Sequence, residues 1–378
     1  MSVNTPDVET VVIGGGQAGL ATAWHLKRLG RSSLVLEGRR RIGDVWRERW
    51  DSLQLFTPAR HSALPGAPHP SADVFLGKDE IADYFATYAE RFDLPVRTGV
   101  HVTSVVREAA GDWLVSTSVG TMRARHVVVA SGPTSLPYTP PMAGTIDASV
   151  HQLHSHDYRR PEQVPDGDVV VVGAATSGLE IALELAATHE VWIAGRPTPH
   201  IPGPVLRYAG DVWWAFISNV LTRGTPAGRK VAERIHERGS PSLRISMHDV
   251  LSAGVHPLPR LARVDRNALV FAAGDDSPAV SRPLPTTIIW CTGARPDLAW
   301  FPELPLDEHG YPVTERGIVT QLPGAYTVGM PFQWGLTSAL IGGAGRDAAY
   351  VSEAIAARAD GAGDVQGSIQ AKPNRTGR

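Results

Sequence analysis

Two residues of opposite charge stand at equivalent places in two similar stretches of the sequence. The first stretch, VETVVIGGGQAGLATAWHLKRLGRSSLVLE, ends at Glu37, and the second, DVVVVGAATSGLEIALELAATHEVWIAGR, ends at Arg196. The same number of positions separates Gly19 from Glu37 and Gly178 from Arg196. A carboxylate in this place accepts hydrogen bonds from a free ribose 2′-hydroxyl, whereas an arginine pairs with a 2′-phosphate. The pattern predicts one dinucleotide of the FAD or NAD type and one NADPH.

Three histidines in HQLHSHDY are a second set of candidate functional side chains, because histidines can bind a metal ion. They are His151, His154 and His156. A zinc site needs three or four ligands that converge, and an extended loop would scatter these imidazoles. The one cysteine of the chain, Cys291, is distant in the sequence. We therefore expect no metal site here.

The elements that would position Glu37 are a strand, a glycine turn and a helix. A β-branched run at 8–13 predicts a buried parallel strand, and a helix capped near Gly30 should precede a strand at 33–36. The turn has GxGxxG spacing, which allows a tight bend and aims the helix N-terminus at a pyrophosphate. Its glycines are Gly14, Gly16 and Gly19.

The second stretch repeats these elements, with strands expected at 169–172 and 191–194. Ala175 takes the middle place of the turn, where its methyl group would meet the pyrophosphate and reduce affinity or displace the loop. Thr198 is placed to add a hydroxyl contact to the 2′-phosphate beside Arg196. The alternative for Arg196 is an ordinary solvated position on the surface. The flanking glycines are Gly173 and Gly178.

The composition limits the possible partners of the protein. The chain has 378 residues, 43% hydrophobic and 20% charged, with a net charge of −2, which indicates no nucleic-acid or membrane-surface partner. No apolar run approaches the ~20 residues that span a bilayer, and residues 1–10 do not resemble a signal peptide, so we expect a cytoplasmic protein. A single cysteine excludes both an intrachain disulfide and a dithiol redox pair.

Three further segments carry a resemblance to a known family. They are IGDVWRERWDSLQLFTP (42–58), VVVASGPTSLPYTP (127–140) and IIWCTGARPDLAWF (288–301). Residues 8 to 358 resemble the bacterial flavin-containing monooxygenases, single-component class B flavoprotein monooxygenases related to the Baeyer–Villiger enzymes. In that family the first segment lies against the flavin, and the other two mark chain crossings between the FAD and NADPH domains. The matching positions of the first segment are Gly43, Trp46, Arg47 and Trp50, with Asp44 in place of a commoner glycine.

HQLHSHDY matches half of a family fingerprint, Phe-x-Gly-x3-His-x3-Trp/Tyr. His154 and Tyr158 stand at its last two places, and Ala148 and Val150 replace its Phe and Gly. The resemblance implies that this segment positions the linker between domains. In AYTVGMPFQWGLTSALIGGAGRDAAYVSEAIAARA, a helix is expected from Thr337 or Ser338 to about residue 359. The resemblance implies that its N-terminus points at the pyrimidine edge of the flavin.

The expected fold is α/β, with two Rossmann-like dinucleotide-binding domains and the NADPH domain inserted into a discontinuous FAD domain. The expected ranges are 1–165 and 291–360 for FAD, 166–290 for NADPH and 361–378 for a flexible tail. An antiparallel hairpin is expected at 100–119. An apolar helix at 206–222, with Trp213 and Trp214, is expected either to cover the active-site mouth or to form a subunit contact. The second alternative would make the protein a homodimer. Arg60 and His61 face either the flavin or the surface.

The resemblance implies that NADPH reduces FAD and that O₂ then forms a C4a-(hydro)peroxyflavin. One oxygen atom passes to a nucleophilic nitrogen or sulfur of a small-molecule substrate, which requires no side-chain nucleophile, and no catalytic residue is assigned. The alternatives are Baeyer–Villiger oxygenation of a ketone and a non-oxygenating NAD(P)H oxidase or redox flavoprotein. Ala175 favours the second of these.

The residues assigned to FAD are Gly14, Gly16, Gln17, Ala18, Gly19, Glu37, Gly43, Trp46, Arg47, Val102, Gln333, Thr337 and Ser338. The residues assigned to NADPH are Gly173, Thr176, Ser177, Gly178, Arg196 and Thr198.

Overall fold

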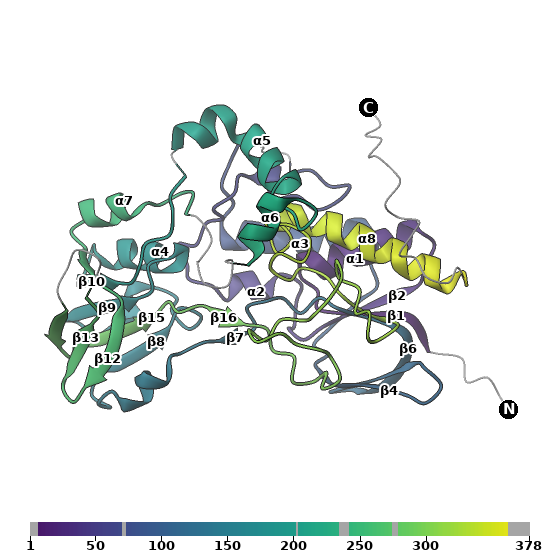
Figure 1. Ribbon diagram of the computed structural model, residues 1–378, viewed down its shortest axis with the longest axis horizontal. Coiled ribbons are helices and arrows are strands. Elements are labelled where there is room, and N and C mark those ends of the chain that lie inside the picture. The colour runs from purple at the N-terminus through teal and green to yellow at the C-terminus, as the bar shows by residue number, and fades with distance from the viewer. Residues whose placement is uncertain (1–6, 70–72, 202, 234–241, 274–278, 362–378) are drawn as a thin grey trace.

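The computed structural model describes residues 7–69, 73–201, 203–233, 242–273 and 279–361. Two sheets, each with a parallel core, lie side by side and are joined by a short crossing, β7 and β16, near the centre of Figure 1. This is the predicted α/β fold. The tail expected at 361–378 lies outside the described residues, apart from its first residue.

The first sheet is built around β1, which runs parallel to β2 on one side and to β6 on the other. Its strands are β1 (Val8–Ile13), β2 (Ser33–Glu37), β3 (Val96–Thr98), β4 (Val102–Arg107), β5 (Trp113–Thr117), β6 (Gly120–Val129) and β17 (Ala325–Thr327). β4 and β5 form the hairpin expected at 100–119. One face carries α1 (Gln17–Arg28), α3 (Lys78–Arg91) and α8 (Ile341–Ala359), whose apolar side chains form a buried core with β1.

The second sheet has the order β11-β10-β9-β15-β8, with all neighbours parallel. Its strands are β8 (His151–His154), β9 (Asp168–Val172), β10 (Glu190–Ala194), β11 (His256–Leu258) and β15 (Thr287–Trp290). Helices α4 (Thr176–Leu185) and α7 (Met247–Ser252) pack against one face. A three-stranded antiparallel sheet packs on the other, formed by β12 (Leu261–Asp265), β13 (Ala268–Phe271) and β14 (Val280–Pro283).

Two segments link the sheets. β7 (Leu136–Pro137) pairs antiparallel with β16 (Ala294–Arg295), so the two crossings expected from the sequence are hydrogen-bonded to each other. β8 pairs with β15 in the second sheet, although its residues fall within the range 1–165 that was expected to belong with the first. The second sheet therefore starts before residue 166, and HQLH is a strand and not the loop we expected.

Two helices differ from their expected bounds. α8 begins at Ile341, not at Thr337 or Ser338, because residues before it form a turn. In that turn the Ser338 hydroxyl accepts hydrogen bonds from the backbone N–H groups of Trp334 and Gly335, each 3.0 Å long. The helix expected at 206–222 is α5 (Gly203–Asn219), which bends at Ala209, where φ is −132°.

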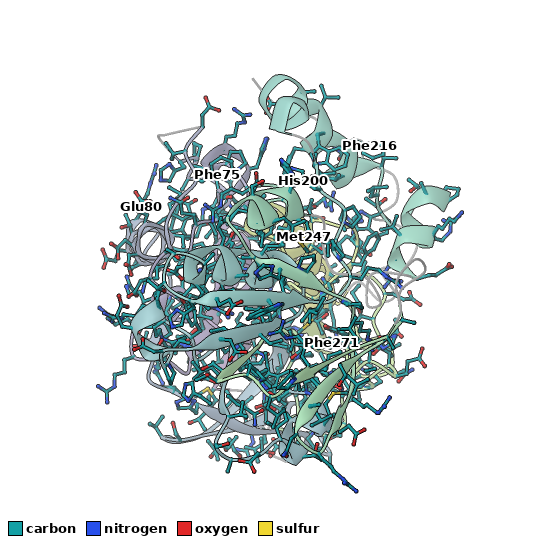
Figure 2. All side chains as sticks on the ribbon, turned by 90° about the vertical axis from the view of Figure 1, so that its left-hand side faces the viewer. Phe75, Glu80, His200, Phe216, Met247 and Phe271 are labelled. Carbon is teal, nitrogen blue, oxygen red and sulfur yellow. The ribbon has the colours of Figure 1, made fainter. Side chains whose placement is uncertain are left out.

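The remaining helices are short. They are α2 (Asp44–Arg47), α6 (Pro226–Ala232) and three 3₁₀ turns at Ala59–His61, Pro141–Thr145 and Pro161–Gln163. α5 and α6 lie over the junction of the two sheets in Figure 1, and Figure 2 shows Phe216 of α5 far from Phe271 of β13. Within the described residues, no helix has both the length and the apolar character required to cross a membrane.

Candidate functional site

The first glycine turn fits closely between β1 and α1. Gly14 has φ of +115°, and a Cβ atom there would lie 2.4 Å from the carbonyl oxygen of Ala130. A Cβ atom on Gly19 would lie 1.8 Å from the Gly14 carbonyl oxygen, so larger residues would push the helix away from the strand. By contrast, no atom of the described residues lies within 4 Å of a Cβ placed on Gly16. The space beside Gly16 is therefore open to a ligand.

The second turn has the same construction. Gly173 has φ of +117°, and its Cβ would lie 2.2 Å from the Cys291 carbonyl oxygen, while a Cβ on Gly178 would lie 1.8 Å from the Gly173 oxygen. Ala175 has φ of −94° and ψ of −174°, close to the −83° and −169° of Gly16. The Ala175 methyl group therefore occupies the position that is open at Gly16.

The two strand-end residues differ in their contacts. The carboxylate of Glu37 accepts hydrogen bonds from the N–H groups of Gly15 (2.7 Å) and Arg39 (2.8 Å), which fix it beside the first turn. Arg196 is exposed and has no hydrogen bond or ion pair with any described residue. The hydroxyl of Thr198 is buried and has no partner there. This arrangement leaves an arginine and a hydroxyl available for an anion.

The segment after the first unit begins with α2, which packs against α3. Gly43 has φ of +86° and caps α2, where a Cβ would clash with the backbone of Ala82. The indole N–H of Trp46 is buried without a partner among the described residues. The Arg47 guanidinium is held by Asp44 (3.2 Å) and Asp83 (2.5 Å). Its charge is thus already paired, which favours a structural role for the arginine we had assigned to FAD.

The loop before α8 lies beside the start of α1. Gln333, Thr337 and Ser338 are buried, and the Thr327 hydroxyl donates to the Gln333 side-chain oxygen at 3.2 Å. The Gln333 amide nitrogen and the Thr337 hydroxyl have no hydrogen-bond partner among the described residues. Gln17, at the start of α1, donates to the carbonyl oxygen of Ala339 at 3.3 Å and so joins the two helix N-termini.

Buried polar atoms without partners indicate what these surfaces are built to hold, because native proteins leave few such atoms. In the first half, the atoms of this kind include Ser131 Oγ, whose residue adjoins Gly14, together with Trp46 Nε1, Gln333 Nε2 and Thr337 Oγ1. A dinucleotide carries many hydrogen-bonding groups, and the open space at Gly16 admits a pyrophosphate. The residues present therefore fit a bound dinucleotide in the first half.

A buried charged cluster that was not predicted from the sequence lies behind this loop. Asp347 is fully buried, and its carboxylate lies 3.8 Å from the Arg346 guanidinium. Burial raises the pKa of Asp347. Arg316 stacks over the ring of Trp334 at 4.4 Å, and Arg346 donates to the backbone oxygen of Ser218 in α5. These charges join α8 to the loop and to α5, a pairing of distant segments that gives no local sequence signal.

Helix α5 docks on the first half through Arg60 and His61. The His61 ring stacks on Trp214, with 4.7 Å between centroids and 14° between planes. Arg60 lies 3.1 Å from the carboxylate of Asp211. Both side chains therefore face α5, a placement that the sequence left open. Beneath the helix is a cavity of about 40 Å³, lined by Thr57, Pro58, Arg60, His61, Gly210, Trp213, Trp214, Ile217, Leu243 and Leu340.

His154 has both ring nitrogens engaged. Nδ1 accepts from the backbone N–H of His156, so Nε2 carries the proton and donates to the Gly293 carbonyl oxygen, each at 3.1 Å. Burial lowers the pKa of His154. Tyr158 is fully buried, and its hydroxyl donates to Glu184 at 2.8 Å. The His154 bond ties the segment to the second crossing, and the Tyr158 bond ties it to α4.

We predict that the protein holds no structural metal at HQLHSHDY. A ligand histidine needs a free ring nitrogen, and His154 has none in this arrangement. No group of three potential ligand side chains that could hold a metal occurs within the described ranges. Elemental analysis after dialysis should give less than one zinc, iron or copper ion per chain. One tightly held metal, lost when His151 or His154 is replaced, would contradict this prediction.

Cys291 is buried at the second crossing, and burial raises the pKa of its thiol to about 12. At neutral pH it is a protonated thiol with little nucleophilic character. The chain has one cysteine, so it cannot form the internal dithiol that a disulfide exchange reaction needs.

Comparison with known proteins places this geometry in a family. A model of the pyridine nucleotide-disulphide oxidoreductases matches residues 11–200. An uncharacterized CzcO-like oxidoreductase of Geobacillus kaustophilus is 36% identical over 349 residues, which are 91% of this chain and 97% of that protein. Rice indole-3-pyruvate monooxygenase YUCCA1 is 34% identical over 179 residues, 46% of this chain and 44% of that protein.

Among solved structures, a flavin-containing monooxygenase from Stenotrophomonas maltophilia is similar over 93% of this chain and 99% of its own. The TM-score is 0.75 and the sequence identity is 27%. The resemblance to flavin-containing monooxygenases that the sequence indicated is confirmed by this similarity. The chain is an oxidoreductase, and it belongs to the pyridine nucleotide-disulphide oxidoreductase family.

Proposed function

We propose that this protein is a FAD-dependent monooxygenase that uses NADPH and O₂ to oxygenate a small molecule at a nucleophilic nitrogen or sulfur. The observation that carries the proposal is the pair of equivalent glycine turns with a carboxylate beside one and an unpaired arginine beside the other. The similarity to the Stenotrophomonas maltophilia flavin-containing monooxygenase supports it. In the proposed division, residues 1–165 and 291–360 mainly serve FAD and residues 166–290 mainly serve NADPH, with β8 of the first range joined to the second sheet.

The first half would bind FAD. The N–H groups at the start of α1 and the open space at Gly16 suit its pyrophosphate, and the Glu37 carboxylate suits a ribose hydroxyl. Val102, at the start of β4, is the proposed backbone contact of the adenine. Trp46, Gln333 and Thr337 offer unpaired polar atoms to the rest of the cofactor. When bound, FAD supplies a two-electron carrier that can react with O₂.

The second half would bind NADPH. Thr176 and Ser177 begin α4, so their N–H groups face the same side as the second turn. Arg196 and Thr198 are the proposed partners of the 2′-phosphate. Neither side chain has to break a hydrogen bond or ion pair with another described residue before it binds a phosphate.

The segment from α5 to α6 would exclude water from the reaction. The strand-like bridge between Thr222 and Gly335 and the Leu336 N–H to Leu221 bond (3.0 Å) hold it on the loop before α8. The stacked pair of His61 and Trp214 holds the other end. A closed site would keep bulk water away while oxygen is transferred, which limits the loss of that oxygen as hydrogen peroxide.

Two alternatives use the same cofactors. In an NAD(P)H oxidase, reduced flavin passes its electrons to O₂ without oxygenating a substrate. Ala175 favours this alternative, because its methyl group would lower the affinity for the bound nucleotide that shields the site. Baeyer–Villiger oxygenation is less favoured, because Ala148 and Val150 replace the fingerprint residues. A disulfide reductase with an internal dithiol is excluded by the cysteine count.

The test is oxygen transfer itself. Purified protein, NADPH and ¹⁸O₂ should be incubated with a panel of amines, sulfides and ketones, with mass detection of products and measurement of hydrogen peroxide. The proposal expects one ¹⁸O atom in an amine or sulfide product. Labelled ester from a ketone would favour the Baeyer–Villiger alternative. Peroxide equal to the NADPH consumed with every compound would favour the oxidase.

A further inference from the structure

Arg49 is a partly buried guanidinium without a partner. It follows α2, and its side chain makes no hydrogen bond or ion pair with the residues that the structure describes. The nearby carboxylates are already engaged. Glu48 pairs with Arg39 at 2.8 Å, and Asp51 pairs with Lys78 at 2.9 Å. A buried charge is costly without a compensating charge, so this position favours an anion supplied from outside the chain.

The surroundings of Arg49 are themselves positive. Burial and then the like charges of Arg39 and Arg159 lower its pKa, and the Glu48 carboxylate offsets this only in part. Burial and then the charge of Arg49 lower the pKa of His156 to about 4, so this imidazole is neutral and adds no repulsion at neutral pH. The Arg159 guanidinium is fixed by bonds to the backbone oxygens of His156 (2.6 Å) and Tyr158 (3.0 Å). The backbone also places Arg159 beside this segment, because its carbonyl oxygen accepts a hydrogen bond from the N–H of Asp51 at 2.8 Å. Three arginines therefore lie near one another, and Glu48 pairs with only one of them, Arg39.

The cluster of Arg39, Arg49 and Arg159 lies where the carboxyl ends of both sheets meet. Arg39 follows β2 and its N–H binds Glu37. Arg159 follows β8, whose last residue, His154, is aligned with Trp290 of β15, which is aligned with Val172 of β9. The second glycine turn begins directly after Val172. Ligands of parallel α/β sheets bind at the carboxyl ends of the strands, so the cluster faces the second dinucleotide site.

We propose that the cluster of Arg39, Arg49 and Arg159 binds the pyrophosphate of the nicotinamide dinucleotide, with Arg49 as its central contact. This inference rests on the proposed function, because it takes NADPH as the ligand. It also accounts for Ala175. The methyl group of that residue fills the place where the backbone of a glycine turn would approach the pyrophosphate, and arginines from the first half supply the lost attraction from the opposite side.

The experiment compares two ligands on the FAD-loaded full chain by calorimetric titration at fixed ionic strength. NADP⁺ carries the pyrophosphate and the 2′-phosphate, whereas 2′-AMP carries only the latter. Arg49→Gln should weaken NADP⁺ binding about tenfold or more and leave 2′-AMP binding unchanged. Arg196→Ala should weaken both ligands. Arg49→Lys should recover part of the NADP⁺ affinity, because it keeps the charge and loses the planar fork.

Stability and a matched control separate binding from a structural role. Arg40→Gln removes the same charge from an exposed neighbour of Arg39 and should leave both affinities unchanged. The melting temperature of Arg49→Gln without NADP⁺ should equal or exceed that of the wild type, because repulsion is relieved, and its shift on adding NADP⁺ should be smaller.

Three results would overturn the inference. One is equal NADP⁺ affinity in Arg49→Gln and wild type. Another is loss of FAD from Arg49→Gln with NADP⁺ affinity retained, which would place the cluster on the other cofactor. The third is a lower melting temperature in both Arg49→Gln and Arg49→Lys, with the two ligands weakened alike. A wild type that binds no NADP⁺ would contradict the proposed function itself, and this inference with it.

Discussion

Replacing Gly19 with alanine is expected to give a protein that retains no FAD. The new Cβ atom would lie 1.8 Å from the Gly14 carbonyl oxygen, so α1 must move away from β1. Overpacking of this kind costs about 1–3 kcal/mol of folding free energy and displaces the N–H groups that face the pyrophosphate. The measurement is flavin released by denaturation per mole of purified chain, together with the melting temperature.

Gly16→Ala is the matched control in the same turn. It adds the same methyl group at a place where no described atom lies within 4 Å, and it copies the alanine already present at residue 175. The melting temperature without cofactor should therefore match the wild type, while FAD affinity falls because the methyl meets the pyrophosphate. If Gly16→Ala and Gly19→Ala both retain FAD like the wild type, the first turn is not the FAD site.

Arg196→Ala is expected to remove a preference of the wild type for NADPH over NADH. The exposed guanidinium has no competing partner in the described part of the chain, so a 2′-phosphate would be paired with it directly. A charge-assisted hydrogen bond contributes about 1.5–3 kcal/mol, which corresponds to roughly tenfold to a hundredfold in relative kcat/KM. Ala175 faces the pyrophosphate common to both nucleotides and should not change the ratio.

The measurement is the ratio of kcat/KM for NADPH and NADH in wild type and variant, at fixed ionic strength. The variant should have a raised KM for NADPH and nearly unchanged values for NADH. Arg263→Ala, which removes an exposed arginine of β12, should keep the wild-type ratio. A wild type that prefers NADH, or a variant that slows both nucleotides equally, would show that Arg196 does not bind the 2′-phosphate.

The sequence predicted best those features whose contacts are local. The bounds of β1 and the roles of Gly14 and Gly19 follow from contacts within one strand–turn–helix unit, and the second unit repeats them. The strand-end positions of Glu37 and Arg196 follow from the same spacing. Local patterns of strand, turn and helix therefore predicted both dinucleotide folds.

Features that depend on contacts between distant segments could not be predicted in this way. The start of α8 is displaced because the Ser338 hydroxyl holds Trp334 and Gly335, and because Leu336 pairs with Leu221. Arg49 is notable only because the nearby carboxylates of Glu48 and Asp51 pair with other residues, which leaves it without an ion pair among the described residues. In the sequence, Arg49 stands among other charged residues and resembles an ordinary surface arginine.

The central claim, that this chain carries FAD and that NADPH reduces it, is tested most directly by anaerobic mixing with NADPH. We predict that the purified protein is yellow with non-covalent FAD, that the flavin absorbance bleaches with one NADPH per chain, and that O₂ restores it. A colourless protein that does not take up added FAD would contradict the account, as would a flavin spectrum that NADPH leaves unchanged.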